Sequence, residues 1–113
     1  MTVKRIGQII KLKPDGYEEY KRLHTAVWPD VLETIYRANL RNYSIYHWNG
    51  FLFAYMEYVG DDLEADMALI ADDPKTREWW ALTDPLQQPI EGNSPSSIEG
   101  EWWTDMETLF HMD

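Results

Sequence analysis

Two residues that could move a proton and hold a ligand, Tyr20 and His24, stand four positions apart. On a helix this spacing places both side chains on the same face. Histidine is the side chain whose charge changes nearest to neutral pH, so it can donate or accept a proton there. Aromatic residues follow at Trp28 and in the doublet Trp79-Trp80. An imidazole among flat aromatic surfaces suits a small, neutral, polyhydroxylated ligand such as a sugar.

The composition narrows the kinds of ligand. The 113 residues carry a formal net charge of −10. A chain this acidic repels phosphate backbones and anionic lipid, which argues against nucleic acid and membrane surfaces as partners. The basic residues near the N-terminus are spread out rather than clustered, which also disfavours phosphorylated and carboxylated substrates. A neutral monosaccharide is the partner we expect.

The chain contains no cysteine, which excludes disulfides, thiolate nucleophiles and cysteine-based zinc sites. The three histidines, His24, His47 and His111, do not stand at a metal-ligand spacing, so we expect no metal site. The apolar run at 6–12 is too short and too polar for a signal peptide or a membrane span. We therefore expect a cytosolic protein.

Turn residues and apolar spacing indicate the elements that must position these side chains. Asn49-Gly50 separates two β-rich runs, which is the strongest short-range signal for a hairpin. Pro29 fits the first turn of a helix, whose expected apolar stripe is Val31, Leu32, Ile35 and Ala38. The expected elements are a strand at 3–12, a helix at 17–24, the helix from Pro29, hairpin strands at 41–48 and 51–58, helices at 63–71 and 74–83, a loop or flap at 87–100 and a last strand at 102–112.

This order of elements predicts an α+β fold of the ferredoxin-like, split β-α-β kind, in a single domain spanning 1–113. Its antiparallel sheet would carry helices on one face only. The other face would expose tyrosine, tryptophan, phenylalanine and isoleucine side chains, and such a face requires a cover. We therefore expect a homodimer whose sheets pack face to face, in the manner of dimeric α/β-barrels.

A series of short motifs runs along nearly the whole chain. They are Tyr20-x-x-x-His24, Trp28-Pro29, Asn42-Tyr43-Ser44-Ile45, Trp79-Trp80, Thr83-Asp84 and Asn93-Ser94-Pro95. In this order and setting they resemble the L-rhamnose mutarotase family. The resemblance implies a dimeric ferredoxin-like enzyme without a cofactor that interconverts the α and β anomers of a 6-deoxyhexose. It also implies that His24 is the catalytic proton donor and that Tyr20, Tyr43, Trp79 and Trp80 bind the sugar.

Two stretches depart from the family pattern. Residues 102–105, Trp-Trp-Thr-Asp, are bulkier than expected for the last strand, and the flap around Ile90-Glu91-Gly92 also differs. Both could change the sugar preference, so L-fucose or a related deoxy sugar is an alternative substrate.

Mutarotation opens a hemiacetal ring, lets the C1–C2 bond rotate and closes the ring again. One group must protonate the ring oxygen and another must accept the proton of the C1 hydroxyl, which is general acid–base work. The reaction runs in water unaided, so it requires no metal. For the second group, the sequence leaves Asp84, Glu57 and a bound water open. Because Trp79 and Trp80 are about 100° apart on a helix, we expect one to face the ligand squarely and the other to reach it from the side or to support the core.

Other readings remain. Judged without the resemblance, His24 could be a satisfied helix histidine, Tyr43 a sheet-face aromatic, and Trp28 or the doublet Trp79-Trp80 packing anchors. A cofactor-independent oxygenase with the same dimeric fold could use the pocket for an aromatic substrate. A third reading is a sugar-binding module without catalysis, which would bind a sugar but leave its anomers exchanging at the buffer rate.

Overall fold

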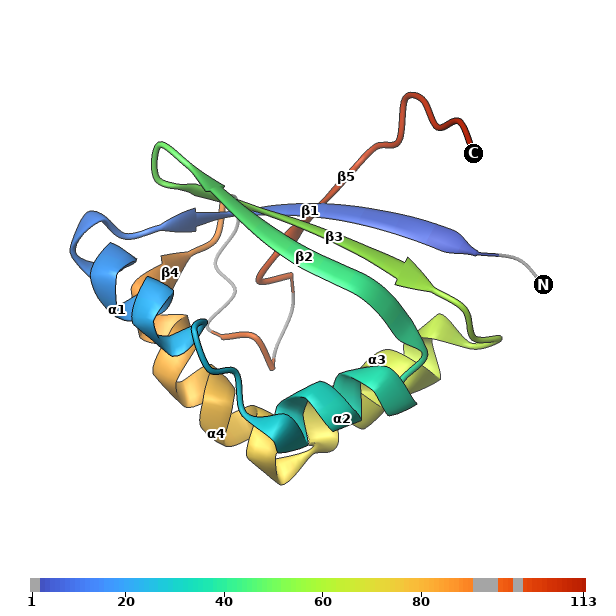
Figure 1. Ribbon diagram of the computed structural model, residues 1–113, viewed down its shortest axis with the longest axis horizontal. Helices are drawn as coiled ribbons and strands as arrows, with labels where there is room; N and C mark the ends of the chain where they lie inside the picture. Colours follow the sequence, from blue (N-terminus) through green and yellow to red (C-terminus); the bar gives the residue numbers. More distant parts are fainter. Residues whose placement is uncertain (1–2, 91–95, 99–100) are drawn as a thin grey trace.

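The computed structural model describes residues 3–90, 96–98 and 101–113. One antiparallel sheet has the strand order β2-β3-β1-β4, and β5 also pairs with β1. All four α-helices lie on one side of the sheet, while the chain after β5 runs on the other side (Figure 1). The elements are β1 Lys4–Leu12, a 3-10 turn Pro14–Gly16, α1 Tyr17–Leu23, α2 Pro29–Arg37, β2 Leu40–Trp48, β3 Phe51–Tyr58, α3 Leu63–Asp72, α4 Pro74–Thr83, a 3-10 turn Asp84–Leu86, β4 Gln87–Gln88 and β5 Thr104–Met106.

The strand order is that of a ferredoxin-like sheet, so the expected α+β class and topology are confirmed. The predicted hairpin is present as β2 and β3, which pair from Leu40 opposite Tyr58 to Trp48 opposite Phe51. Asn49 and Gly50 both have positive φ angles, 50° and 81°, as a type I′ turn requires.

Two of the helices, α3 and α4, begin where a capping side chain satisfies a free backbone N–H group. Asp62 and Asp73 precede α3 and α4, and their carboxylates accept hydrogen bonds from the backbone N–H of Ala65 and Thr76. Pro29 occupies the first turn of α2, as its fixed φ favours. These caps fix the ends of the helices that lie beneath the sheet.

The inner face of the sheet forms the core with the helices. Along β3 the buried residues alternate strictly, at Leu52, Ala54, Met56 and Tyr58, so this face points toward the helices. Val31 and Ala38 of the α2 region are buried as predicted. Leu32, however, is 52% exposed, which corrects the predicted stripe. It lies only about 100° from Val31 around the helix, which turns it past the packed face.

The C-terminal part differs from the prediction in two respects. Gln87–Gln88 forms a short strand on β1 inside the expected loop, and Pro89 ends it because proline has no N–H to donate. The last strand is only Thr104–Met106, because Trp102 and Trp103 turn into the core instead of alternating along a strand. Of the rest of the predicted loop or flap, residues 91–95 and 99–100 lie outside the described residues; they include Asn93-Ser94-Pro95 and two residues of Ile90-Glu91-Gly92.

In the part of the chain that the structure describes, no helix combines the length and the apolarity needed to cross a bilayer.

Candidate functional site

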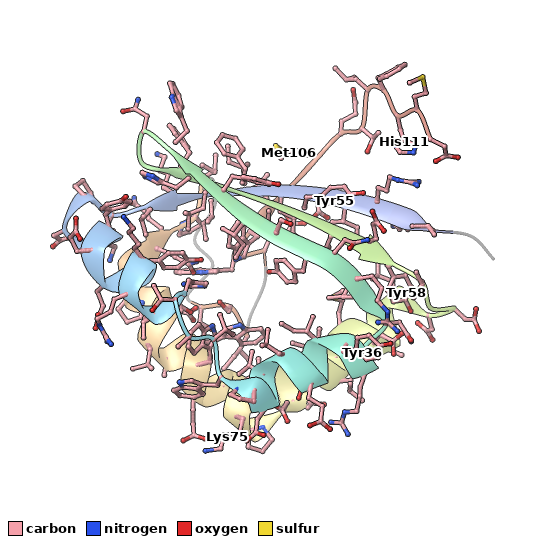
Figure 2. All side chains as sticks on the ribbon, viewed as in Figure 1. Tyr36, Tyr55, Tyr58, Lys75, Met106 and His111 are labelled. Carbon is pink, nitrogen blue, oxygen red and sulfur yellow. The ribbon has the colours of Figure 1, made fainter. Side chains whose placement is uncertain are left out.

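A cavity of about 1420 Å³ lies between the inner face of the sheet and the helices. Figure 2 shows side chains from both layers projecting into this space. All the site residues that the sequence predicted contribute to its lining: Tyr20, His24, Tyr43, Trp79 and Trp80. They come from α1, its C-terminal cap, β2 and α4, so the fold brings together residues up to 60 positions apart in the chain.

His24 is held at the end of α1 by a backbone atom. Its Nδ1 lies 2.8 Å from the carbonyl oxygen of Tyr20, one helical turn earlier. A carbonyl oxygen only accepts hydrogen bonds, so Nδ1 must carry the hydrogen. In the neutral imidazole, Nε2 then has the free lone pair. Nε2 is therefore the atom that can exchange a proton with a ligand.

The surroundings of His24 favour its neutral form. Burial lowers the pKa of the imidazole, and the hydrogen bond to the Tyr20 carbonyl opposes this shift only in part. The ring lies half-buried against two aromatic side chains. Its centroid is 4.2 Å from that of Tyr20, in a stacked arrangement, and 5.4 Å from that of Trp79, which meets it edge-on. A ring held in this way can take up a proton without reorienting.

The two tryptophans of α4 differ in burial. Trp79 is 6% exposed and packs in a cluster with Leu23 and Val31. Its ring also meets Trp28 edge-on at 5.2 Å, so Trp28 supports the wall from behind. Trp80 is half-buried and joins two core clusters. Both residues reach the cavity, and Trp79 is the one that contacts the imidazole.

A β-bulge in β2 directs Tyr43 to the inner face. Arg41 stands opposite Glu57 and Ser44 opposite Tyr55, so β2 carries one extra residue at this point. Asn42 adopts a φ of 51° there and donates a hydrogen bond from Nδ2 to Glu57 at 2.9 Å. Without the extra residue the alternation would place Tyr43 on the opposite face.

The Tyr43 hydroxyl lies in a desolvated position. Although 38% of the residue's surface is exposed, burial around the hydroxyl raises the pKa of Tyr43 to about 12. Burial likewise raises the pKa of Tyr20, and the nearby Tyr43 raises it further. Both phenols therefore stay protonated at neutral pH and can act as hydrogen-bond donors.

Sequence reasoning missed two residues beside the site. Gln87 and Trp102 are buried and form a hydrogen-bonded chain that ends on the Tyr20 hydroxyl. Gln87 carries no spacing signal, since it lies in a stretch rich in proline, glycine and serine. The bulk of Trp102 was visible in the sequence as a departure from the family pattern, but its partner was not.

The carboxylates considered as second proton-transfer groups do not line the cavity. Asp84 accepts hydrogen bonds from the backbone N–H and the hydroxyl of Ser97. These bonds hold Ser97 against the 3-10 turn Asp84–Leu86. Glu57 alternates with the buried Met56, so it points to the outer face, where it binds Asn42 and Tyr55. Within residues 3–90, 96–98 and 101–113, no group of three or more His, Asp or Glu side chains could hold a metal ion.

The fold and the cavity define a class of small α+β proteins with a half-buried histidine held among aromatic side chains. Within this class, the family described as L-rhamnose mutarotase matches residues 5–112. The chain belongs to the L-rhamnose mutarotase family, as the resemblance indicated.

Individual relatives agree with this assignment. An L-rhamnose mutarotase from Lactiplantibacillus plantarum is 36% identical over 96% of this chain and 98% of its own length. One from Ligilactobacillus salivarius is 36% identical over the whole of both chains. The crystal structure of L-rhamnose mutarotase from Formosa agariphila has a TM-score of 0.74 with this structure, covering 97% of this chain and 99% of that one. At 23% identity, this last likeness supports the fold alone.

Proposed function

We propose that this protein is an isomerase that interconverts the α and β anomers of L-rhamnose or a closely related 6-deoxyhexose. The observation that carries the proposal is the imidazole of His24 in an aromatic-lined cavity: its Nδ1 is bound to a backbone carbonyl, and its Nε2 has no hydrogen-bond partner among the described residues. Membership in the mutarotase family favours this function over the oxygenase alternative. The negative net charge agrees with a neutral substrate.

In the proposed reaction, Nε2 of neutral His24 first takes the proton from the C1 hydroxyl. The electron pair left on O1 forms the C1=O double bond, and the C1–O5 bond breaks with its electrons on the ring oxygen. The imidazolium of His24 then donates its proton to O5, which gives the open-chain aldehyde. Rotation about C1–C2 and the reverse steps close the ring as the other anomer, and His24 ends neutral.

A single histidine can serve both oxygens because O1 and O5 are bonded to the same carbon. This is consistent with the positions of Asp84 and Glu57, neither of which lines the cavity. His24 remains the donor to the ring oxygen, as the family resemblance implies, but it receives that proton from the substrate. The lowered pKa of His24 fits a group that starts the cycle unprotonated.

The aromatic side chains would bind the sugar. The rings of Trp79 and Trp80 offer apolar surface for the C–H groups and the methyl group of a 6-deoxy sugar, while the hydroxyls of Tyr20 and Tyr43 can donate hydrogen bonds to its oxygens. The choice between L-rhamnose and L-fucose depends on the orientation of individual hydroxyl groups, and the assay below compares the two sugars.

Exchange between anomer signals in NMR spectra tests the function. With protein added, we expect the α/β exchange of L-rhamnose to exceed the buffer rate, and to exceed the acceleration seen with L-fucose. If both sugars bind but exchange at the buffer rate, the protein is a sugar-binding module. If neither sugar binds and an aromatic compound does, the oxygenase reading replaces the mutarotase reading.

We also propose that the protein is a homodimer joined through the outer face of its sheet. Because alternate residues of β3 face the helices, Phe51, Phe53 and Tyr55 face outward, and β2 adds Tyr46 and Trp48, which are strongly exposed. Met106 and His111 lie on this same side of the sheet (Figure 2), and the exposed Leu109, Phe110 and Met112 follow in the C-terminal segment. So much apolar surface indicates a protein partner.

Light scattering can test the dimer. The wild type should have twice the mass of one chain, and Trp48→Glu should shift it toward the monomer. Tyr36→Glu is the matched control, since Tyr36 is also an exposed aromatic but lies on the helix side (Figure 2). A monomeric wild type would contradict the proposal.

The cytoplasm is the proposed site of action, because a chain without cysteine has no need of an oxidising compartment. Fractionation of the producing cells, with the protein found only outside the cytoplasm, would refute this.

A further inference from the structure

Three buried side chains form a chain of hydrogen bonds beside the cavity. The indole Nε1 of Trp102 donates to Oε1 of Gln87 at 2.9 Å, and Nε2 of Gln87 donates to the hydroxyl oxygen of Tyr20 at 3.2 Å. Gln87 is only 4% exposed, and Tyr20 and Trp102 are buried as well. Tyr20 and Trp102 line the cavity, whereas Gln87 stands behind them.

The direction of these hydrogen bonds is fixed by chemistry. An indole N–H can only donate, so the Gln87 atom next to Trp102 must be the carbonyl oxygen. The amide NH₂ of Gln87 must then be the atom that faces Tyr20. An NH₂ group can only donate, so the Tyr20 hydroxyl must accept from it. The hydroxyl hydrogen of Tyr20 therefore points elsewhere.

The hydroxyl hydrogen of Tyr20 is available to a ligand in the cavity. Among the described residues, the Tyr20 hydroxyl makes no hydrogen bond other than the one it accepts from Gln87, and Tyr20 lines the cavity. We propose that Gln87 is a positioning residue that, with its amide oriented by Trp102, makes Tyr20 a dedicated hydrogen-bond donor to the sugar. This inference rests on the proposed function. It states that, in the same site, the Tyr20 hydroxyl donates a hydrogen bond to the sugar and does not accept one from it.

A fixed donor has a clear use in the proposed reaction. Negative charge builds on O1 when His24 removes its proton, and on O5 as the C1–O5 bond breaks. A hydroxyl that is already aimed into the cavity stabilises such charge without reorganising. Burial raises the pKa of Tyr20, so the phenol keeps its hydrogen across the neutral range and remains a donor.

The substitution Gln87→Glu tests the direction of the hydrogen bond between residue 87 and the Tyr20 hydroxyl. A carboxylate at this position would accept from Trp102 with one oxygen and from Tyr20 with the other, which would turn the Tyr20 hydrogen away from the sugar. We expect L-rhamnose exchange about tenfold or more slower than in the wild type at high pH. When the carboxyl group is protonated at lower pH, it can again donate to Tyr20. The ratio of variant rate to wild-type rate should therefore rise as pH falls.

Gln87→Met is the matched control, because it removes both hydrogen bonds without reversing either. Its rate ratio should be reduced but independent of pH. A merely structural role for Gln87 would give flat ratios for both variants, and that result would overturn the inference. Circular dichroism of each variant establishes that the chain is folded.

A double-mutant cycle keeps the inference testable if Gln87→Glu fails to fold. In a Tyr20→Phe background, Gln87→Met should have almost no further effect on exchange or on L-rhamnose affinity, because the group it positions is gone. Additive losses would overturn the inference.

The wild-type exchange assay decides the proposed function separately. If the wild type binds L-rhamnose without catalysing exchange, the same cycle measured by sugar affinity still decides the role of Gln87.

Discussion

The backbone carbonyl of Tyr20 lies 2.8 Å from Nδ1 of His24, one turn further along the same helix. The two residues are thus coupled twice, by this hydrogen bond and by the stacking of their rings. The orientation of the imidazole consequently depends on the end of α1 rather than on a distant carboxylate. This differs from the common arrangement in which an acidic side chain fixes the histidine tautomer and stabilises its charged form.

The first prediction concerns pH. Burial lowers the pKa of His24, so the basic form that starts the proposed cycle is populated above that lowered pKa. After subtraction of the buffer rate, the catalysed exchange should rise with pH below about 6.5, the usual pKa of histidine, and level off above it. Exchange measured between about pH 5 and 8 checks this. A catalysed rate that falls as pH rises through this range would show that the protonated imidazole starts the reaction.

The same shift affects stability. Because the folded state favours neutral His24, it binds fewer protons than the unfolded state between the lowered pKa and the usual one. The contribution of His24 is therefore fully present above the usual pKa and is lost as pH falls through the window between the two values. The difference in unfolding free energy between the wild type and His24→Asn, followed by urea denaturation, should become less favourable to the wild type as pH is lowered. A difference that does not change with pH would contradict this.

The second prediction concerns the bulge at Asn42. Its φ of 51° lies in the left-handed region, which a β-branched residue adopts only at a cost. Asn42→Val should lower the unfolding free energy by about 1–2 kcal/mol and slow sugar exchange, because Tyr43 follows directly in the chain. Asn42→Gly, which tolerates this φ, should retain most of the activity. Equal losses in the two variants would argue that the side-chain bond to Glu57, rather than the backbone conformation, supports the bulge.

The third prediction separates the two tryptophans of α4. Trp79 is buried and contacts both His24 and Trp28, so Trp79→Ala should cost about 3–5 kcal/mol of unfolding free energy. Trp80 is only half-buried, and Trp80→Ala should cost less stability and act mainly on sugar affinity. Urea denaturation and sugar titration measure the two effects. The reverse order of stability losses would contradict the packing described above.

Some of the site could be predicted because the information is local. The four-residue spacing of Tyr20 and His24 places them on one face whatever surrounds the helix, and Asn49-Gly50 fixes the hairpin by its own backbone preference. Pro29 likewise acts within a single turn, at the start of α2. These features gave the order of elements and hence the ferredoxin-like topology.

Other features depend on contacts between distant residues. The bulge at Asn42 is a register shift against β3, and no pattern in β2 alone indicates it. Gln87 is buried because Trp102, fifteen positions later, returns to bond it, and the same inward turn shortens the last strand. Glu57, by contrast, could have been removed as a candidate acid or base, since its neighbours Met56 and Tyr58 already indicate the inner face by alternation.

Anomer exchange of L-rhamnose by His24→Asn, measured by NMR beside the wild type, tests most directly whether the imidazole of His24 transfers the proton. An asparagine amide can still donate to the Tyr20 carbonyl, so the end of α1 is kept while the titratable nitrogen is lost. We expect the variant to fold and to bind the sugar but to exchange its anomers at the buffer rate. A variant that still accelerates exchange as the wild type does would contradict the account, because the proton would then have to travel through another group.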